Sequence, residues 1–257
     1  MKLESPVSRH LYQCGAERGR MTGGPGKAEQ TRRAIVECAL GMACARGLGS
    51  LTLGTVADRM GLSKTGVFAR VGSIEALQLH VLAAYRTRFD RQVAAPARAA
   101  PAGTARLRAM FAYWARQVGE EGCLYLSCAS EFAHRPGPLR DAVLADVLAW
   151  RLGLEHCARQ AVDGGQLAAA TDVRQLACDM SGLVLALHHD VRLLGAGDGA
   201  GRSMRAFERL LAACAGAAGA RPPPFSLVSL DDDSGRCHNH NRRMFPAIEG
   251  VMHHDRN

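Results

Sequence analysis

Residues 52–68 read TLGTVADRMGLSKTGVF, and this stretch decides the fold that we expect for the chain. Thr52 can cap a first short helix by accepting a hydrogen bond from a free backbone N–H. Gly61 is expected to end that helix, because glycine readily adopts the positive φ that a sharp turn often needs. The pattern predicts two short helices, residues 53–60 and 64–71, joined by a tight turn.

The second short helix is too polar on one side to be a core element, because Lys64, Thr65 and Arg70 cannot all face inward. Its length and charge suit a recognition helix, whose N-terminal end enters the major groove of DNA and whose dipole favours phosphates. The residues expected to contact DNA are Thr52, Ser63, Lys64, Thr65, Gly66, Val67, Phe68 and Arg70. Two short helices around a glycine turn also occur in proteins that never bind nucleic acid, so a helical protein-binding adaptor stays an alternative.

Charge is concentrated in the N-terminal third of the chain. The formal net charge is +8, and residues 22–90 hold +4 of it, from 9 basic and 5 acidic residues. Residues 91–220 hold only +2, from 14 basic and 12 acidic residues. A basic N-terminal third suits a partner made of phosphate, although a solvated arginine-rich surface would give the same count.

Glycine, proline and helical periodicity divide the chain into four regions. Residues 1–26 end in the helix breakers TGGPG and are expected to form a flexible arm, with Met21 an alternative start. Residues 27–93 are expected to form the helix-turn-helix DNA-binding domain, and residues 94–219 a second helical domain. Residues 220–257, which begin RPPP and have no apolar period, are expected to be disordered.

The same periodicity sets the finer organisation. Residues 94–103, with two prolines, predict a linker or a bend between the two domains. Helices are expected near 103–119, 123–134, 138–163, 172–194 and 200–217. No segment has the alternation of a half-buried strand, so the predicted fold class is all-α.

Residues 29–85 resemble the DNA-binding domain of the TetR family of regulators. The matching features are the long first helix, the glycine-rich turn before Leu51-Thr52, the pair Val56-Ala57, the run Gly61-Leu62-Ser63-Lys64, and Ser73 to Leu77 opening the next helix. The segment from Gly122 to Pro138 resembles the ligand domain of one subgroup. The resemblance implies a three-helix DNA-binding domain followed by a helical ligand-binding and dimerisation bundle.

The resemblance also implies partners and a function. We expect a homodimeric regulator that binds double-stranded operator DNA, a repressor released by a small-molecule effector. Dimerisation is expected through residues 172–217, whose two helices carry more apolar surface than one shell of neighbours needs. The apolar residues behind this expectation are Leu176, Met180, Leu183, Val184, Leu187, Phe207, Leu210, Leu211 and Cys214.

Aromatic and sulfur-containing side chains of the second domain are candidates for the effector site, because such sites are mostly apolar. The candidates are Met110, Trp114, Tyr125, Cys128, Phe132 and Trp150. Each is more often plain core.

No metal or cofactor is expected. His188 and His189 are neighbours that point about 100° apart on a helix, so they are poorly placed to share one ion. Tail residues of ligating type have no predicted fold to hold them: Cys237, His238, His240, His253 and His254.

Cysteine usage and the absence of a long apolar run place the chain in the cytoplasm. No run approaches the ~18 apolar residues of a membrane span. Nine cysteines occur without a CxxC pair, and Cys38, Cys44, Cys157, Cys178 and Cys214 fall in helical apolar patterns. They are expected to be buried, reduced thiols. A redox pair of Cys123 and Cys128 is a weaker reading.

An enzyme is the alternative from a different class. A small helical hydrolase would use Cys123 or His134 together with Glu131, but no catalytic motif supports such a site. The chain is therefore expected not to be an enzyme.

Overall fold

Side-chain caps and glycines set the bounds of the N-terminal helices in the structure, a computed structural model that describes residues 26–195 and 197–215. The elements are α1 (Lys27–Arg46), the 3-10 turn η2 (Leu48–Ser50), α2 (Leu53–Met60), α3 (Lys64–Val71) and α4 (Ile74–Phe89). The two short helices have the bounds that the sequence predicts. A buried cluster that includes Ile35, Val56 and Val81 holds α1 to α4 together.

Helical winding continues from α4 past residue 93, the expected end of the DNA-binding domain. A π-helical turn, η3 (Asp90–Ala94), follows α4, and α5 (Ala95–Arg98) follows that. The prediction of a linker or bend over residues 94–103 is therefore wrong for its first half. Pro96 lies in the first turn of α5, where a helix does not need the N–H that proline lacks.

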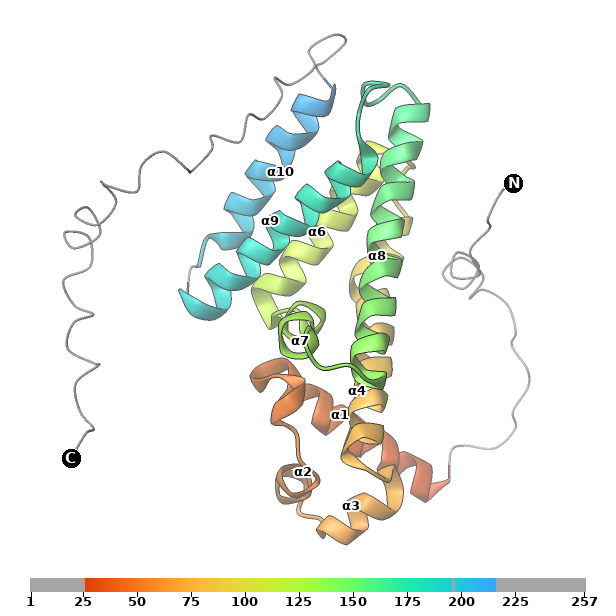
Figure 1. The fold of residues 1–257 in the computed structure, drawn as a ribbon, viewed down its shortest axis with the longest axis vertical. Coiled ribbons are helices and arrows are strands. Elements are labelled where there is room, and N and C mark those ends of the chain that lie inside the picture. Colours follow the sequence, from red (N-terminus) through yellow and green to blue (C-terminus); the bar gives the residue numbers. More distant parts are fainter. Residues whose placement is uncertain (1–25, 196, 216–257) are drawn as a thin grey trace, which may run out of the picture. The chain divides into compact units, whose positions relative to one another are not determined.

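Five longer helices complete the described fold: α6 (Thr104–Glu121), α7 (Leu124–Phe132), α8 (Pro138–Asp163), α9 (Val173–Leu193) and α10 (Gly199–Ala215). Their bounds lie within two residues of the predicted ones. Helices α6, α9 and α10 lie side by side, and α8 runs past them and reaches α4 (Figure 1). The described residues contain no strand, in keeping with the predicted all-α class.

Aromatic side chains fill the interior of this second group of helices. Phe111 of α6 stacks on Phe207 of α10 with ring centroids 4.2 Å apart. A chain of edge-to-face contacts runs from Tyr125 through Phe89 to Trp150 and on to Trp114. These contacts join α7, α4, α8 and α6, and α4 shares one continuous buried cluster with the N-terminal helices.

The cysteines are more varied than the sequence suggested. Cys157 is buried as expected, Cys38, Cys44 and Cys214 are half-buried, and Cys178 is exposed. The expectation is wrong for Cys178 because it lies on the outward face of α9. The flexible arm over 1–26 and the disordered tail over 220–257 fall outside the described residues, apart from Gly26.

Candidate nucleic-acid interface and ligand pocket

The turn between α2 and α3 is fixed by its caps. The Thr52 hydroxyl accepts a hydrogen bond from the backbone N–H of Thr55 at 3.0 Å, and the Thr55 hydroxyl accepts one from the N–H of Thr52. Gly61 ends α2 in the left-handed region, with φ 65° and ψ 32°. The Ser63 hydroxyl accepts from the N–H of Gly66 at 3.0 Å and starts α3. These caps fix where α2 begins and ends and where α3 begins.

Gly66 has a structural reason to be glycine. A Cβ added there would lie 3.0 Å from the Ser63 hydroxyl oxygen, which is tighter than ordinary packing. The N-terminal cap of α3 therefore already favours glycine, apart from any close approach of DNA to the backbone.

Most residues expected to contact DNA present their side chains to solvent. Lys64, Thr65 and Arg70 are exposed, and Phe68 is 56% exposed, which is unusual for so large an apolar side chain. Thr52 and Ser63 are exposed caps. Val67 is different, because its side chain is fully buried between the helices. The expectation that Val67 contacts DNA is corrected accordingly: the core holds its side chain.

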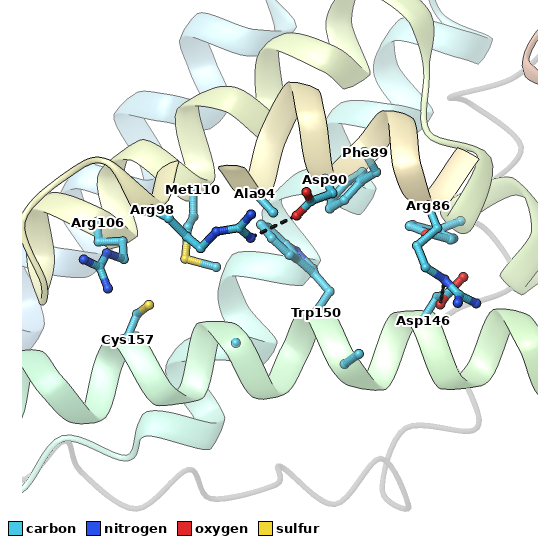
Figure 2. A pocket seen from close by; sticks show the side chains of 13 residues that line it. Arg86, Phe89, Asp90, Ala94, Arg98, Arg106, Met110, Asp146, Trp150 and Cys157 are labelled. Atoms are coloured by element: carbon cyan, nitrogen blue, oxygen red, sulfur yellow. Dashed lines mark hydrogen bonds and ion pairs between the residues drawn. The ribbon is translucent and has the colours of Figure 1, made fainter. Parts of the chain in front are cut away.

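A pocket lies at the junction of α4, η3, α5, α6, α7 and α8 (Figure 2). The cavity has a volume of about 120 Å³ and is partly open to solvent. Apolar side chains, among them Phe89, Met110 and Trp150, line its middle. Charged side chains stand at both ends in the view of Figure 2, with Arg106 at one end and Asp146 with Arg86 at the other.

The structure brings together half of the residues expected to bind a ligand. Met110, Tyr125 and Trp150 line this pocket. Trp114 lies behind it, with its ring edge-to-face against Trp150 at 5.5 Å between centroids. Cys128 and Phe132 lie elsewhere, in a separate, mainly apolar groove between α7 and α8.

The charged lining residues were not predicted. Four of them come from consecutive elements between residues 86 and 106, and the fifth comes from α8: Arg86, Asp90, Arg98, Arg106 and Asp146. One signal was available, since Asp146 falls on the same helical stripe as Val143 and Trp150, where a carboxylate is out of place.

Polar contacts tie the N-terminal helices to the rest of the fold. The Glu131 carboxylate of α7 accepts hydrogen bonds from the backbone N–H groups of Leu48 and Gly49 in η2. Arg192 of α9 donates to the carbonyl oxygens of Cys44 and Ala45 at 3.1 and 2.8 Å, at the C-terminal end of α1. Both contacts satisfy backbone groups that a helix end leaves free.

A buried cluster of hydrogen bonds around Tyr85 ties α4 to α6 and α7. The Tyr85 hydroxyl accepts hydrogen bonds from the Gln117 amide at 3.0 Å and from the N–H of Leu124 at 3.2 Å, and it donates to the Cys123 sulfur at 3.6 Å. Burial raises the pKa of the Cys123 thiol, which keeps it protonated. The redox reading of Cys123 and Cys128 loses support, because burial also raises the pKa of Cys128.

No cluster of three or more His, Cys, Asp or Glu side chains that could hold a metal ion occurs within residues 26–195 and 197–215. The tail residues Cys237, His238, His240, His253 and His254 lie outside these ranges. No single described helix is long and apolar enough to cross a membrane, although Lys64–Val71 and Ile74–Arg98, bent by 63°, pass the same length and composition test as a pair.

Taken together, a capped helix-turn-helix and a helical domain with an internal pocket define a two-part helix-turn-helix protein. Residues 103–207 match the family model described as tetracyclin repressor-like, C-terminal domain. With the fold, this match confirms the resemblance to the TetR family that the N-terminal motif indicated. No curated protein sequence matches the chain.

Solved structures share the fold. A TetR-family transcriptional regulator from Cytophaga hutchinsonii matches with 18% identity and a TM-score of 0.65, over 75% of this chain and 98% of that one. A TetR transcriptional regulator from Chloroflexus aurantiacus matches with 18% identity and a TM-score of 0.66, over 72% and 94%. AibR, in complex with isovaleryl coenzyme A and operator DNA, matches with 22% identity and a TM-score of 0.56, over 68% and 94%.

Proposed function

We propose that the protein is a DNA-binding transcriptional repressor that a small molecule in the α4–α8 pocket releases from its operator. The observation that carries this proposal is the path of α4. Only two residues separate the end of α3 from the start of this helix, which contributes Arg86 and Phe89 to the pocket lining. A ligand that moves this segment of α4 also moves the recognition helix.

The proposed DNA-binding residues are the exposed ones: Thr52, Ser63, Lys64, Thr65, Phe68 and Arg70, with Gly66 offering its backbone. Lys64 and Arg70 would pair with phosphates, while Thr65 and Phe68 are placed to reach base edges. A role on chromosomal DNA would place the protein in the cytoplasm. The same fold in AibR binds both operator DNA and a small molecule, which supports the proposal.

A homodimer would read two half-sites about 34 to 36 Å apart. The apolar residues that first suggested a dimer are mostly used within the protomer, since Leu176, Val184 and Phe207 are buried there. A different stripe on α9 stays open: Cys178 and Gly182 are exposed, and Leu185 is 52% exposed. We place the dimer interface on this stripe and the adjoining face of α10.

The hydrolase alternative has weaker support. Cys123 is buried with a raised pKa, and the Glu131 carboxylate binds the backbone of η2 instead of orienting a base. His134 is exposed. A nucleophile, a base and an orienting group do not converge in these residues, so we propose that the protein is not an enzyme.

Two measurements test the proposed function. The first is a mobility-shift titration against the DNA upstream of the protein's own gene, repeated as salt rises from about 50 to 200 mM; affinity should fall steeply as counterions are released. The second is a thermal-shift screen of apolar metabolites, followed by operator titration with each binder. An affinity that does not change with salt, or binders that all leave operator affinity unchanged, would contradict the proposal.

A further inference from the structure

The pocket has one uncompensated positive charge. Five charged side chains line it: Arg86, Arg98, Arg106, Asp90 and Asp146. Arg86 pairs with Asp146 at 2.7 Å, and Arg98 pairs with Asp90 at 2.9 Å. Arg106 has no carboxylate within 4 Å in the described part of the chain. The lining therefore carries a formal charge of +1, and Arg106 is the residue that holds it.

Arg106 is held in place by one edge of its guanidinium. Its Nε and one terminal nitrogen donate to the carbonyl oxygen of Ala100 at 3.1 and 3.0 Å. A guanidinium has five N–H donors in a planar fork, so its other edge is left to bind an anion. Figure 2 shows the side chain at the pocket end beside Cys157.

Two buried polar atoms of the lining, one at the other end of the pocket and one toward its middle, lack hydrogen-bond partners in the described residues. The side chain of Asp146 is 8% exposed; its Oδ1 pairs with Arg86, and the Tyr125 hydroxyl also interacts with this carboxyl. Oδ2 is buried and no donor meets it with hydrogen-bond geometry in the described residues. The Nε1 of Trp150, one helical turn along α8, is also buried without a partner. A buried polar atom without a partner costs free energy, so both atoms favour a ligand group that can donate and accept.

A hydroxyl is the small group that meets both needs, because it donates one hydrogen bond and accepts others. It would donate to the Asp146 carboxylate and accept from the Trp150 N–H. Burial raises the pKa of the Asp146 carboxyl, and the charge of Arg86 together with hydrogen bonding from Arg86 and Tyr125 opposes that shift.

The spacing of the two ends sets the length of the ligand. Asp146 and Cys157 are 11 positions apart on α8, which corresponds to about 16 Å along a helix. Met110, Trp150 and Phe89 line the pocket between these positions.

We propose that the pocket binds an elongated, mainly apolar monoanion, with an acid group on Arg106 and a hydroxyl between Asp146 and Trp150. The proposal rests on the proposed function in one respect only: it assumes that a molecule of this class is the effector that releases the protein from its operator. Contacts at both ends favour an ω-hydroxy carboxylate of about twelve carbons, a length close to that of the pocket.

The test uses three probes of one chain length: ω-hydroxydodecanoate, dodecanoate and dodecane-α,ω-diol. In calorimetric titrations of the full-length protein, the hydroxy acid should bind tightest, the plain acid next and the diol weakest. Arg106→Gln should weaken both acids by about tenfold or more and leave the diol unchanged, and Arg106→Lys should restore part of the loss. Arg159→Gln, an exposed arginine on α8, is the matched control.

Trp150→Phe tests the other end, because it keeps an aromatic ring and removes the N–H. It should remove the preference for the hydroxy acid over dodecanoate. The proposal fails if no probe binds, if the diol binds as tightly as the acids, or if Arg106→Gln behaves like Arg159→Gln. A thermal melt of each variant checks that it is folded.

Operator titration with the same probes separates this proposal from the proposed function. Acids that bind in the expected order and depend on Arg106, but leave operator affinity unchanged, would uphold the ligand class and contradict the regulatory role. Release of the operator by neutral apolar molecules alone would uphold the regulatory role and overturn the ligand class.

Discussion

The carboxylate of Glu131 lies against the backbone of Gly49, with Oε1 2.6 Å from the Gly49 nitrogen, although the two residues are 82 positions apart. A Cβ at Gly49 would collide with this carboxylate, so the contact depends on glycine there. Oε2 accepts from the N–H of Leu48 at 3.1 Å. One side chain of α7 thus fixes the turn that leads into α2.

Glu131→Gln should lower the free energy of unfolding by about 1 to 2 kcal/mol, because an amide offers one acceptor oxygen where the carboxylate offers two and a charge. Urea unfolding measures the change. Glu120→Gln, an exposed glutamate on α6, is the control and should stay within about 0.5 kcal/mol of the parent. Equal stabilities for the two variants would mean that the Glu131 contact contributes little.

Thr65→Ala and Val67→Ala should separate base reading from packing. Thr65 is exposed, so its loss should weaken operator binding by about 1 to 3 kcal/mol and leave stability and nonspecific DNA binding close to the parent. Val67 is fully buried, so its truncation should lower stability by about 1 to 3 kcal/mol. Paired mobility-shift and urea titrations check both. If Thr65→Ala weakens operator and random DNA equally, Thr65 only positions the backbone.

Leu185→Glu should convert the dimer to folded monomers. The side chain is 52% exposed in the protomer, so a charge there costs little until a second copy covers it. Light scattering at micromolar concentration gives the mass, and circular dichroism checks the fold. Leu144→Glu, at a position on α8 that is 43% exposed, should remain dimeric. A parent protein that is monomeric under these conditions would contradict the proposed interface.

Asp146→Asn should change how stability depends on pH. Burial raises the native pKa of this carboxyl above its unfolded value, so the native state binds the proton more readily than the unfolded chain. The stability that this proton contributes is present below the unfolded pKa and is lost as pH rises through the native pKa. Relative to Asp146→Asn, the parent should therefore lose stability as pH rises.

Urea unfolding of both proteins from about pH 4 to pH 7 measures that difference. Asp163→Asn, an exposed aspartate at the end of α8, is the control and should track the parent. If the parent instead became more stable relative to the Asp146→Asn variant as pH rises, the sign would be reversed and the argument contradicted.

Local signals made much of the fold predictable. Thr52, Gly61 and Ser63 interact only with residues close to them in the sequence. The first and last residues of the two helices that they delimit, α2 and α3, were therefore predicted correctly. Pro96 led to the incorrect prediction of a linker or bend. Proline interrupts a helix where its missing N–H would have bonded to the preceding turn, but here Pro96 follows a π turn and lies in the first turn of α5, where that N–H is not needed.

The pocket was less predictable, because its charged residues meet only in three dimensions. The period of α6 placed Met110 inward but could not show that Arg106 would find no carboxylate. The ion pair of Arg86 with Asp146 joins α4 to α8 across 60 positions. Likewise, apolar periodicity marked Leu176 and Phe207 as buried without showing whether a neighbouring helix or a second copy covers them.

The π turn η3 gives α4 a place to change its winding. A π turn carries one residue more per hydrogen-bonded ring than an α turn, and Asp90 and Ala94 of this turn line the pocket. If a bound ligand converted this π turn to α-helical winding, the helix on one side would rotate by about 100° and advance by about 1.5 Å relative to the helix on the other side. A local change of winding beside the pocket would thus turn and shift α4 along its axis, and α3 would move with it without any bend in α4.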